Sequence, residues 1–259
     1  MKAVAKPIIE PLRPIPVTRP DTIEDTLEPD HTTEASPGLA PMVQLRHVSL
    51  AGRGNRLLLD RVNLSLPRGS FHFLTGADEE ALARVVDMIA LAYPPQSGSL
   101  SVMGEAHDGL DALAIARLRR DMGLVLDTYG LIEGASVRDN IALAQIVRKR
   151  PLADVDEMLR WLGIDALAER PVDGLDLRER ALVKLARALV PAPPLILAHN
   201  ALADLGDADI SRLLGLFAAL SRAGTTVLLS APVSGSPRPG TMAASRLHLA
   251  EGRITRGGS

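Results

Sequence analysis

The chain has 259 residues, enough for one large domain or two small ones with a substantial core. Hydrophobic residues make up 46% of the sequence but aromatic residues only 2%, so any core must be aliphatic. The net charge of −2, without a long basic run, argues against a cationic nucleic-acid surface, and the lack of cysteine excludes disulfides and thiolate metal sites.

Residues 1–41 differ in composition from the rest of the chain. They hold eight of the nineteen prolines and an acidic middle that runs from Asp21 to Asp30. Apolar periodicity is absent and nothing resembles a signal peptide, so we expect a disordered tail, with a partner-binding tether as the alternative. No stretch approaches the roughly 18 apolar residues of a membrane span, so any membrane role is expected to depend on a partner.

From Met42 the pattern changes to short aliphatic strands and helices. MVQLRHVSL (42–50) and RLLLDRVNLSLP (56–67) alternate as strands do, and the glycine-rich turn between them contains Gly52, Gly54 and Asn55. FHFLT (71–75) is expected to be a buried strand that leads into a helix ending near residue 91. The next predicted elements are a strand at 97–104, a helix at 111–120 and a short buried strand at 122–127.

The segment from about 135 to 170 has a wholly helical pattern, with Ser136 and Asp154 as expected N-caps. The rest of the chain is predicted to contain a helix at 178–190, a strand at 194–198, a helix at 210–224 that ends at Gly224, a strand at 225–231 and a hairpin-like pair at 245–254. Aliphatic strands that alternate with helices predict an α/β fold, with a mainly parallel sheet covered on both faces. The helical segment is expected to be an insert in that fold.

These segments together resemble a known family. The strand, glycine turn and helix at 71–91, then SGSLSVMG, RLRRDMGLVLDTYGLIEGASVRDNIAL, LARALV, LILAHNALADLGD and GTTVLLS, are similar to ABC-type ATPase subunits. The likeness is strongest to the cell-division ATPase FtsE and next to lipoprotein-release and macrolide-export subunits, over about residues 43–256. It implies a P-loop NTPase-like ABC nucleotide-binding domain over 42–259, with a mainly parallel sheet and an antiparallel β part. It also implies a helical subdomain at about 111–175.

The phosphate loop departs from the family pattern, G-x-x-x-x-G-K-S/T. Gly76 occupies the first glycine position, whereas Ala81, Leu82 and Ala83 stand where the second glycine, the lysine and the metal-binding hydroxyl belong. The glycines let backbone amides approach phosphate, the lysine contacts the outer phosphates and the hydroxyl binds magnesium. At about 1.5–3 kcal/mol for each charge-assisted hydrogen bond, these losses remove about 5 kcal/mol or more of ATP binding.

The same turn carries three carboxylates, Asp78, Glu79 and Glu80. A carboxylate about 4 Å from a phosphate would add repulsion of about 4 kcal/mol at an effective dielectric constant near 20. The carboxylates instead suit the positive N-terminus of the following helix, with Asp78 as its cap. We therefore expect weak or absent binding of ATP and magnesium.

The other positions that the resemblance assigns to nucleotide chemistry are substituted as well. Gly52 stands where the family has the aromatic residue that stacks on adenine, and Asp127 stands where it has the glutamine that senses magnesium and water. In the signature motif, Asp176 replaces the serine, and Leu177 and Arg178 replace the two glycines. His199 and Asn200 replace the metal-binding aspartate and the catalytic glutamate, Pro232 replaces the switch histidine, and Gly206 replaces the aspartate of the D-loop. In the family, ATP lies between the phosphate loop of one subunit and the signature of another. Because both motifs are altered, neither a homodimer nor a heterodimer is expected to contain a competent site, and the chain is predicted to be a pseudo-ATPase.

The resemblance also implies a membrane partner. In relatives, the segment matching Asp127, Tyr129, Leu131 and Ile132 helps line a groove that receives a helix of the membrane subunit, although ordinary packing would also explain these residues. The leading hypothesis is a structural or regulatory subunit of a cell-division complex. It would lie on the cytoplasmic side of the inner membrane, bound to an FtsX-like permease. The alternatives are a weakly active ATP-binding subunit that exports a lipid, lipoprotein or small molecule, and a soluble enzyme with unrelated chemistry. No catalytic triad and no metal-ligand spacing among the six histidines supports the last alternative.

Overall fold

The computed structural model describes residues 40–257 apart from residues 53, 55, 149–152 and 236–243. The tail predicted for residues 1–41 therefore falls almost entirely outside the described residues, as does Asn55 of the predicted glycine turn. Within the described part of the chain, no helix is both long enough and apolar enough to cross a membrane.

A four-stranded antiparallel sheet opens the described part, and its strand order is β2-β1-β4-β5. The strands are β1 (Val43–Ala51), β2 (Leu57–Leu66), β4 (Ser97–Val102) and β5 (Glu105–Ala106). β1 and β2 alternate between buried apolar and more exposed residues over most of their length, as expected for strands with one face on a core. The strands predicted from residues 42–67 and 97–104 are thereby confirmed.

The second sheet has six strands in the order β10-β9-β3-β8-β7-β6. Its strands are β3 (Phe71–Gly76), β6 (Met122–Val125), β7 (Leu195–His199), β8 (Thr226–Pro232), β9 (Ser245–Ala250) and β10 (Arg253–Arg256). All pairs are parallel except β9 with β10, which forms the predicted hairpin. The carboxyl ends of β3, β8, β7 and β6 thus lie along one edge.

The two faces of the six-stranded sheet belong to different hydrophobic clusters. Along β7, Ile196 and Ala198 join the first core cluster, whereas Leu195 and Leu197 join the second. This alternation is the period of two that a strand imposes on its side chains. Both faces are covered, which explains why β7 reads as a continuous apolar run in the sequence.

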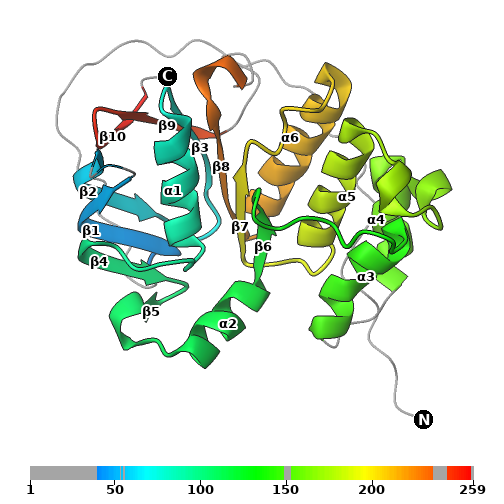
Figure 1. Ribbon diagram of the computed structural model, residues 1–259, viewed down its shortest axis with the longest axis horizontal. Coiled ribbons are helices and arrows are strands. Elements are labelled where there is room, and N and C mark those ends of the chain that lie inside the picture. Colours follow the sequence, from blue (N-terminus) through cyan, green and yellow to red (C-terminus); the bar gives the residue numbers. More distant parts are fainter. Residues whose placement is uncertain (1–39, 53, 55, 149–152, 236–243, 258–259) are drawn as a thin grey trace. The chain divides into compact units, whose positions relative to one another are not determined.

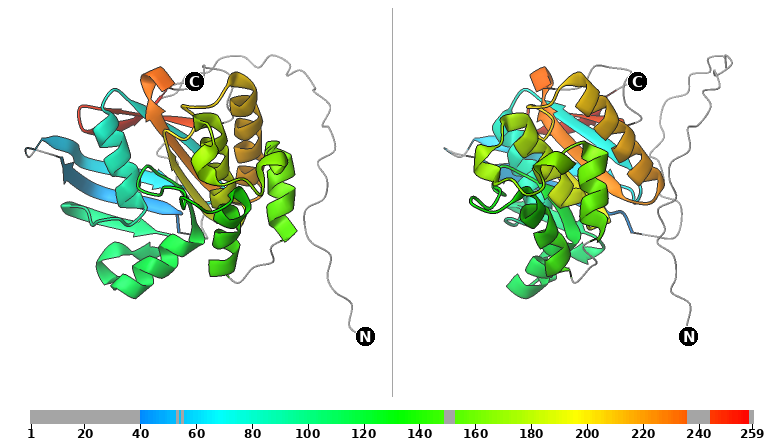
Figure 2. Two further views of the ribbon diagram at one scale, coloured as in Figure 1. Left: turned by 45° about the vertical axis from the view of Figure 1, so that its right-hand side comes forward. Right: turned by 90° about the vertical axis from the view of Figure 1, so that its right-hand side faces the viewer.

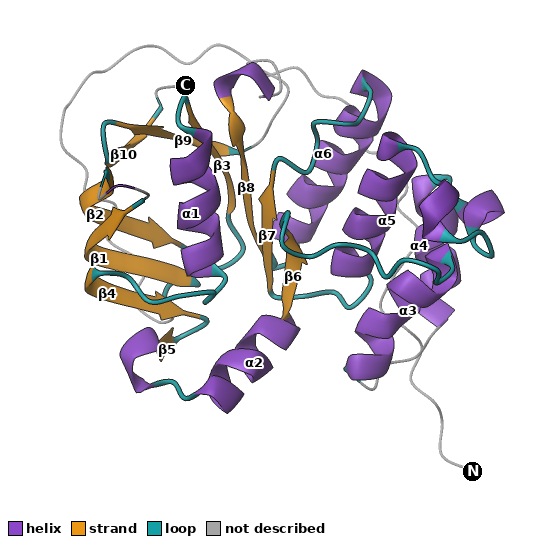
Figure 3. Ribbon diagram, in the orientation of Figure 1, coloured by secondary structure: helices purple, strands orange, loops and turns teal. Residues whose placement is uncertain are grey.

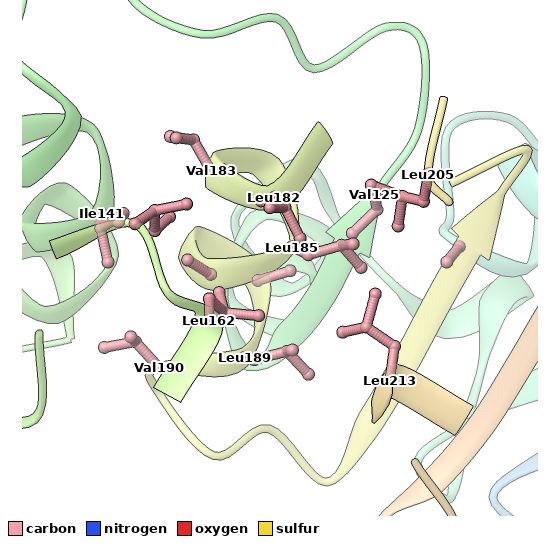
Figure 4. Packing of buried hydrophobic residues seen from close by; sticks show 14 of the residues in the cluster. Val125, Ile141, Leu162, Leu182, Val183, Leu185, Leu189, Val190, Leu205 and Leu213 are labelled. Atoms are coloured by element: carbon pink, nitrogen blue, oxygen red, sulfur yellow. The ribbon is translucent and has the colours of Figure 1, made fainter. Parts of the chain in front are cut away.

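Helices cover both faces of this sheet (Figures 1 and 2). On one side, α1 (Glu79–Ile89) packs against β3, β7 and β8, and its apolar residues share the second core cluster with the antiparallel sheet. On the other side, α6 (Asp207–Arg222) packs against β3 and β8, and α5 (Leu177–Leu189) packs against β6. The aliphatic residues of the first core cluster fill the space around α5, as Figure 4 shows for Leu182, Leu185 and Leu189.

The chain between β6 and β7 is helical, as predicted (Figure 3). It contains α3 (Val137–Val147) and α4 (Ala153–Leu162), which pack against α5, whereas α2 (Ala112–Asp121) precedes β6. Ser136 caps α3 as predicted, because its side chain accepts a hydrogen bond from the Asp139 amide. The prediction of Asp154 as an N-cap is wrong: Asp154 lies inside the first turn of α4, where its carboxylate accepts a hydrogen bond of 3.1 Å from Gln145.

Candidate functional site

Gly76 ends β3 and begins the turn that corresponds to a phosphate loop. A Cβ atom placed on Gly76 would lie 2.6 Å from the backbone oxygen of Leu249 in β9, closer than such atoms approach. The neighbouring strand β8 reaches the same edge, because Gly76 and Pro232 are partners in the parallel register. Strand packing alone is thus sufficient to require glycine here.

Gly76→Ala is expected to destabilise the protein by about 1–3 kcal/mol, because the added methyl group must displace the backbone of β9. Gly109→Ala serves as the control, since a Cβ atom at Gly109 meets nothing within 4 Å. Denaturant unfolding of both variants measures the difference. Equal stability of the two variants would contradict the packing role of Gly76.

The three carboxylates of the turn are organised around the start of α1. Asp78 is the N-cap, and its carboxylate accepts a hydrogen bond of 3.0 Å from the Ala81 amide. Glu79 and Glu80 lie in the first turn, where the helix dipole favours negative charge. The predicted cap is confirmed, and an amide that could have faced a phosphate is already satisfied by the chain itself.

Arg56, just before β2, neutralises part of this negative charge. Its guanidinium forms ion pairs with Asp78 and Glu80, the latter at 2.8 Å. The hydrogen bond from Arg56 is the main cause that lowers the pKa of Asp78. Sequence reasoning missed Arg56, because 22 residues separate it from Asp78 and no motif links them.

Asp78→Asn is expected to lower stability at neutral pH and to lose that effect in acid. The folded-state pKa of Asp78 is depressed, so its ionic contribution is complete above the unfolded pKa near 3.9 and disappears as the pH falls through the folded value. Asparagine still caps helices, so the variant isolates the charge. Denaturant unfolding at pH 7 and near pH 2.5 measures the change, and Asp108→Asn, at an exposed turn, is the control. A deficit of the same size at both pH values would contradict the pairing.

The positions of the missing glycine and lysine are part of the hydrophobic core. Ala81 and Leu82 are 2% and 0% exposed and belong to the second core cluster, and Ala83 is half-buried. The side chain of Leu82 points toward the end of β3, since one of its methyl groups lies 3.5 Å from the position of a Cβ on Gly76. Position 82 therefore stabilises the contact between α1 and the sheet.

Gly52, at the position of the adenine-stacking aromatic, lies beside the same turn. A Cβ on Gly52 would lie 2.8 Å from a carboxylate oxygen of Glu80 and 2.9 Å from Leu58. An aromatic ring has no room in this arrangement. The residues around the turn do not fit Mg·ATP. The lysine, the metal-binding hydroxyl and the aromatic ring that stacks on adenine are absent from the positions where the family has them, and the Asp78 carboxylate occupies an amide that could otherwise bind phosphate.

The start of α5, at the position of the signature motif, is also capped by its own residues. Asp176 and Glu179 form a capping box: the Asp176 carboxylate accepts from the Glu179 amide at 2.7 Å, and the Glu179 carboxylate accepts from the Asp176 amide at 3.0 Å. Leu177, in place of a signature glycine, is 68% exposed. Arg178 forms a bidentate ion pair with the buried Asp209 of α6, at 2.6 and 3.1 Å.

The carboxyl ends of β6 and β7 border a cavity of about 180 Å³. Asp127, His199 and Asn200 line it together with Lys184 of α5, the only lysine among the described residues. His199 is 5% exposed, its Nδ1 lies 2.8 Å from the Ser230 hydroxyl, and burial lowers its pKa. The described residues contain no cluster of three or more acidic, histidine or cysteine side chains suited to hold a metal ion.

The four residues predicted for a partner groove are distributed over different surroundings. Tyr129 lines a cavity of about 280 Å³ between α2, α3 and α5, whereas Asp127 lines the smaller cavity beside His199. Leu131 is buried in the first core cluster, and Ile132 is 48% exposed. The partner groove thus stays a prediction, and the structure adds a cavity in which arginines from several helices surround Tyr129.

Comparisons with known proteins agree with this fold. The family model described as ABC transporter matches residues 59–203. The cell division ATP-binding protein FtsE of Mycobacterium tuberculosis is 31% identical over 195 residues, which cover 73% of this chain and 84% of the relative. The lipoprotein-releasing system ATP-binding protein LolD of Bordetella avium is 30% identical over 205 residues, covering 77% and 88%. A solved dimeric ATP-binding cassette in a post-hydrolysis state with ADP and Pi superimposes with a TM-score of 0.73 at 22% identity, covering 83% and 97%.

Proposed function

The chain belongs to the ABC transporter family, and from that premise we propose that it is a catalytically inactive ATP-binding-type subunit that acts through its contacts with other proteins. One observation carries the proposal. In this family the N-termini of two helices face the nucleotide, and in this chain the backbone amides at both N-termini are hydrogen-bonded to carboxylates of the chain itself. Asp78 caps α1 and is paired with Arg56, and Asp176 caps α5 within a capping box. A phosphate would have to displace these groups or lie beside them.

The proposal extends to the partner and the place of action. The likeness to FtsE supports a structural or regulatory role in cell division, with an FtsX-like integral membrane protein as partner. Through that partner the subunit would lie at the cytoplasmic side of the inner membrane. Pairing with a second ABC domain, identical or different, is part of the proposal, because a similar cassette has been solved as a dimer.

Co-expression of the full chain with an FtsX-like membrane protein from the same genome tests this function. We expect a detergent-solubilised complex in equal yield with and without Mg·ATP, and no vanadate-sensitive ATP turnover. Turnover above the background of the membrane protein alone would overturn the inactive assignment and favour the alternative, a weakly active exporter of a lipid, lipoprotein or small molecule. Failure of the two proteins to associate would overturn the FtsX-like partner.

A further inference from the structure

A cavity of about 560 Å³ lies between α2, the end of α3, the turn from β4 to β5 and the chain that follows α5. Its volume is within the range of sites that bind small molecules. Four separate elements contribute to its lining, among them Met103 of the turn, Arg117 and Arg120 of α2, Val147 of α3 and the segment 191–194. We call it the α2–α3 cavity.

One wall of the α2–α3 cavity is apolar and held in place. It is the segment PAPP, residues 191–194, in which the three prolines have no N–H group. The carbonyl oxygen of Pro194 accepts a hydrogen bond of 2.9 Å from the Thr226 amide. The ring of Pro193 lies against β6, because a Cβ atom on Gly123 would be only 2.8 Å from it. The wall is therefore preformed, and its side chains are hydrocarbon.

Arginines supply the positive charge of the α2–α3 cavity. Arg117 and Arg120 are exposed and lie three residues apart on α2, so they share one side of the helix. Within the described part of the chain, no ion pair joins either arginine to a carboxylate, and Asp121 is the one acidic residue that lines the cavity. Arg148 holds α3 to α2, because its guanidinium donates hydrogen bonds to the backbone oxygens of Arg120 and Met122. Two guanidinium groups within one helical turn suit the oxygens of a phosphate group.

Exposed aliphatic side chains lie on the same two helices. Leu113 of α2 is 75% exposed, and its spacing of four and seven residues from Arg117 and Arg120 places it on their side of the helix. On α3, Ile146 and Val147 are 59% and 47% exposed, and Val147 lines the cavity. Both helices lie in the lower half of the ribbon in Figure 1. A small phosphorylated metabolite would leave these side chains in water, whereas an amphiphile covers them.

We propose that the α2–α3 cavity binds the head of an anionic phospholipid. The phosphate meets Arg117 and Arg120, and the glycerol and first acyl carbons lie against Val147 and the proline wall. Leu113 and Ile146 then touch the lipid surface from which the head projects. This inference goes beyond the proposed function, in which contact with the membrane depends on a partner protein. A nucleic acid is a poorer fit, because none of the described residues that line the cavity is aromatic and could stack on a base.

Vesicles test the lipid directly. The probe is a vesicle made of phosphatidylcholine and phosphatidylglycerol at a 3:1 ratio, and the matched control is a pure phosphatidylcholine vesicle of the same diameter. We expect the full chain to bind the anionic vesicle about tenfold more tightly in 50 mM salt, and the difference to shrink at 300 mM because salt screens the charges. Flotation in a density gradient measures both affinities. Equal affinities, or binding to neither vesicle, would overturn the inference.

Arg117→Gln combined with Arg120→Gln is expected to abolish the preference for anionic vesicles. Arg222→Gln combined with Arg253→Gln is the matched control, because it removes the same charge from two exposed arginines of α6 and β10 and should leave the preference intact. Loss of the preference to the same extent in both double variants would show general electrostatic attraction and overturn the site.

The aliphatic contact has its own test. Leu113→Ser combined with Ile146→Ser is expected to weaken binding to the anionic vesicle by about fivefold or more while keeping the preference over phosphatidylcholine, because it removes apolar contact and no charge. Both residues are exposed, so the fold is expected to tolerate the change. Unchanged binding would refute the contact of these side chains with lipid.

A short-chain lipid separates a lipid head from other anions. Calorimetric titration with monomeric dihexanoylphosphatidylglycerol is expected to show one site per chain, which the Arg117 and Arg120 double variant loses, and inorganic phosphate at the same concentration is expected to give no binding. Equal binding of inorganic phosphate would assign the arginines to a free anion. Binding of an amphipathic leucine–glutamate peptide that depends on both arginines, without vesicle binding, would assign the surface to a protein. Either outcome would overturn the lipid.

These outcomes are separable from a failure of the proposed function. The vesicles contain neither a membrane protein nor nucleotide, so ATP turnover by the complex would overturn the inactive assignment and leave the lipid site in place. Conversely, loss of vesicle binding would remove the lipid site without changing the nucleotide chemistry of Asp78 and Asp176.

Discussion

Saturating Mg·ATP is expected to leave the thermal unfolding midpoint of the full-length chain unchanged to within about 0.5 °C. A ligand at 100 times its dissociation constant stabilises a protein by about 2.7 kcal/mol, which raises the midpoint by about 5–10 °C for a domain of this size. Such a rise requires a cation and free amides at the phosphates. Here Leu82 replaces the lysine, and the Asp78 carboxylate occupies the Ala81 amide.

Differential scanning fluorimetry with 1 mM Mg·ATP measures the effect, and isothermal titration calorimetry measures binding directly. The cell division ATP-binding protein FtsE of Mycobacterium tuberculosis, treated identically, is the positive control. A shift of several degrees for this chain, or a dissociation constant in the micromolar range, would refute the pseudo-ATPase proposal. If Mg·ATP raises the unfolding midpoint of Asp78→Ala but not that of the unsubstituted chain, the Asp78 cap is the group that excludes phosphate.

Local patterns in the sequence predicted most of the fold. The strands and helices follow from apolar periods of two and about 3.6 residues. Ser136 and Asp78 could be predicted as caps because a cap bonds the amide only three residues further along the chain. The prediction of Asp154 as an N-cap is wrong for a local reason as well, because an acidic residue is favourable both in the first turn of a helix and at its N-cap. The sequence pattern alone does not distinguish the two positions.

The ion pairs of the candidate site join residues that are far apart in the sequence. Arg56 meets Asp78 and Glu80 only because β2 and the start of α1 come together in the fold, and Arg178 reaches Asp209 across the contact of α5 with α6. The spacing of three residues between Asp209 and Arg212 indicates an ion pair within the helix. Nothing in the sequence indicates the second partner of Asp209, which is Arg178.

Substitution of Leu82 has the largest expected effect on stability of any single change at the site. Leu82→Ala is expected to cost about 2–5 kcal/mol, because it removes a fully buried side chain between α1 and the sheet and leaves a cavity. Leu113→Ala, at a leucine of α2 that is 75% exposed, is the matched control and should change stability by less than about 0.5 kcal/mol. Denaturant unfolding of both variants measures the difference, and a cost below about 1 kcal/mol for Leu82→Ala would show that position 82 is not a core position.

The large loss of stability expected for substitutions of Leu82 also affects whether a nucleotide site could be restored by mutation. Leu82→Lys would bring an ammonium group into the second core cluster, where burial of an unpaired charge is strongly unfavourable. The lysine would have to extend toward Asp78 and Glu80, which Arg56 already pairs. Reversion therefore requires changes at Arg56, at the acidic turn and at the core together, and Leu82→Lys alone is expected to destabilise the chain without conferring a response to Mg·ATP.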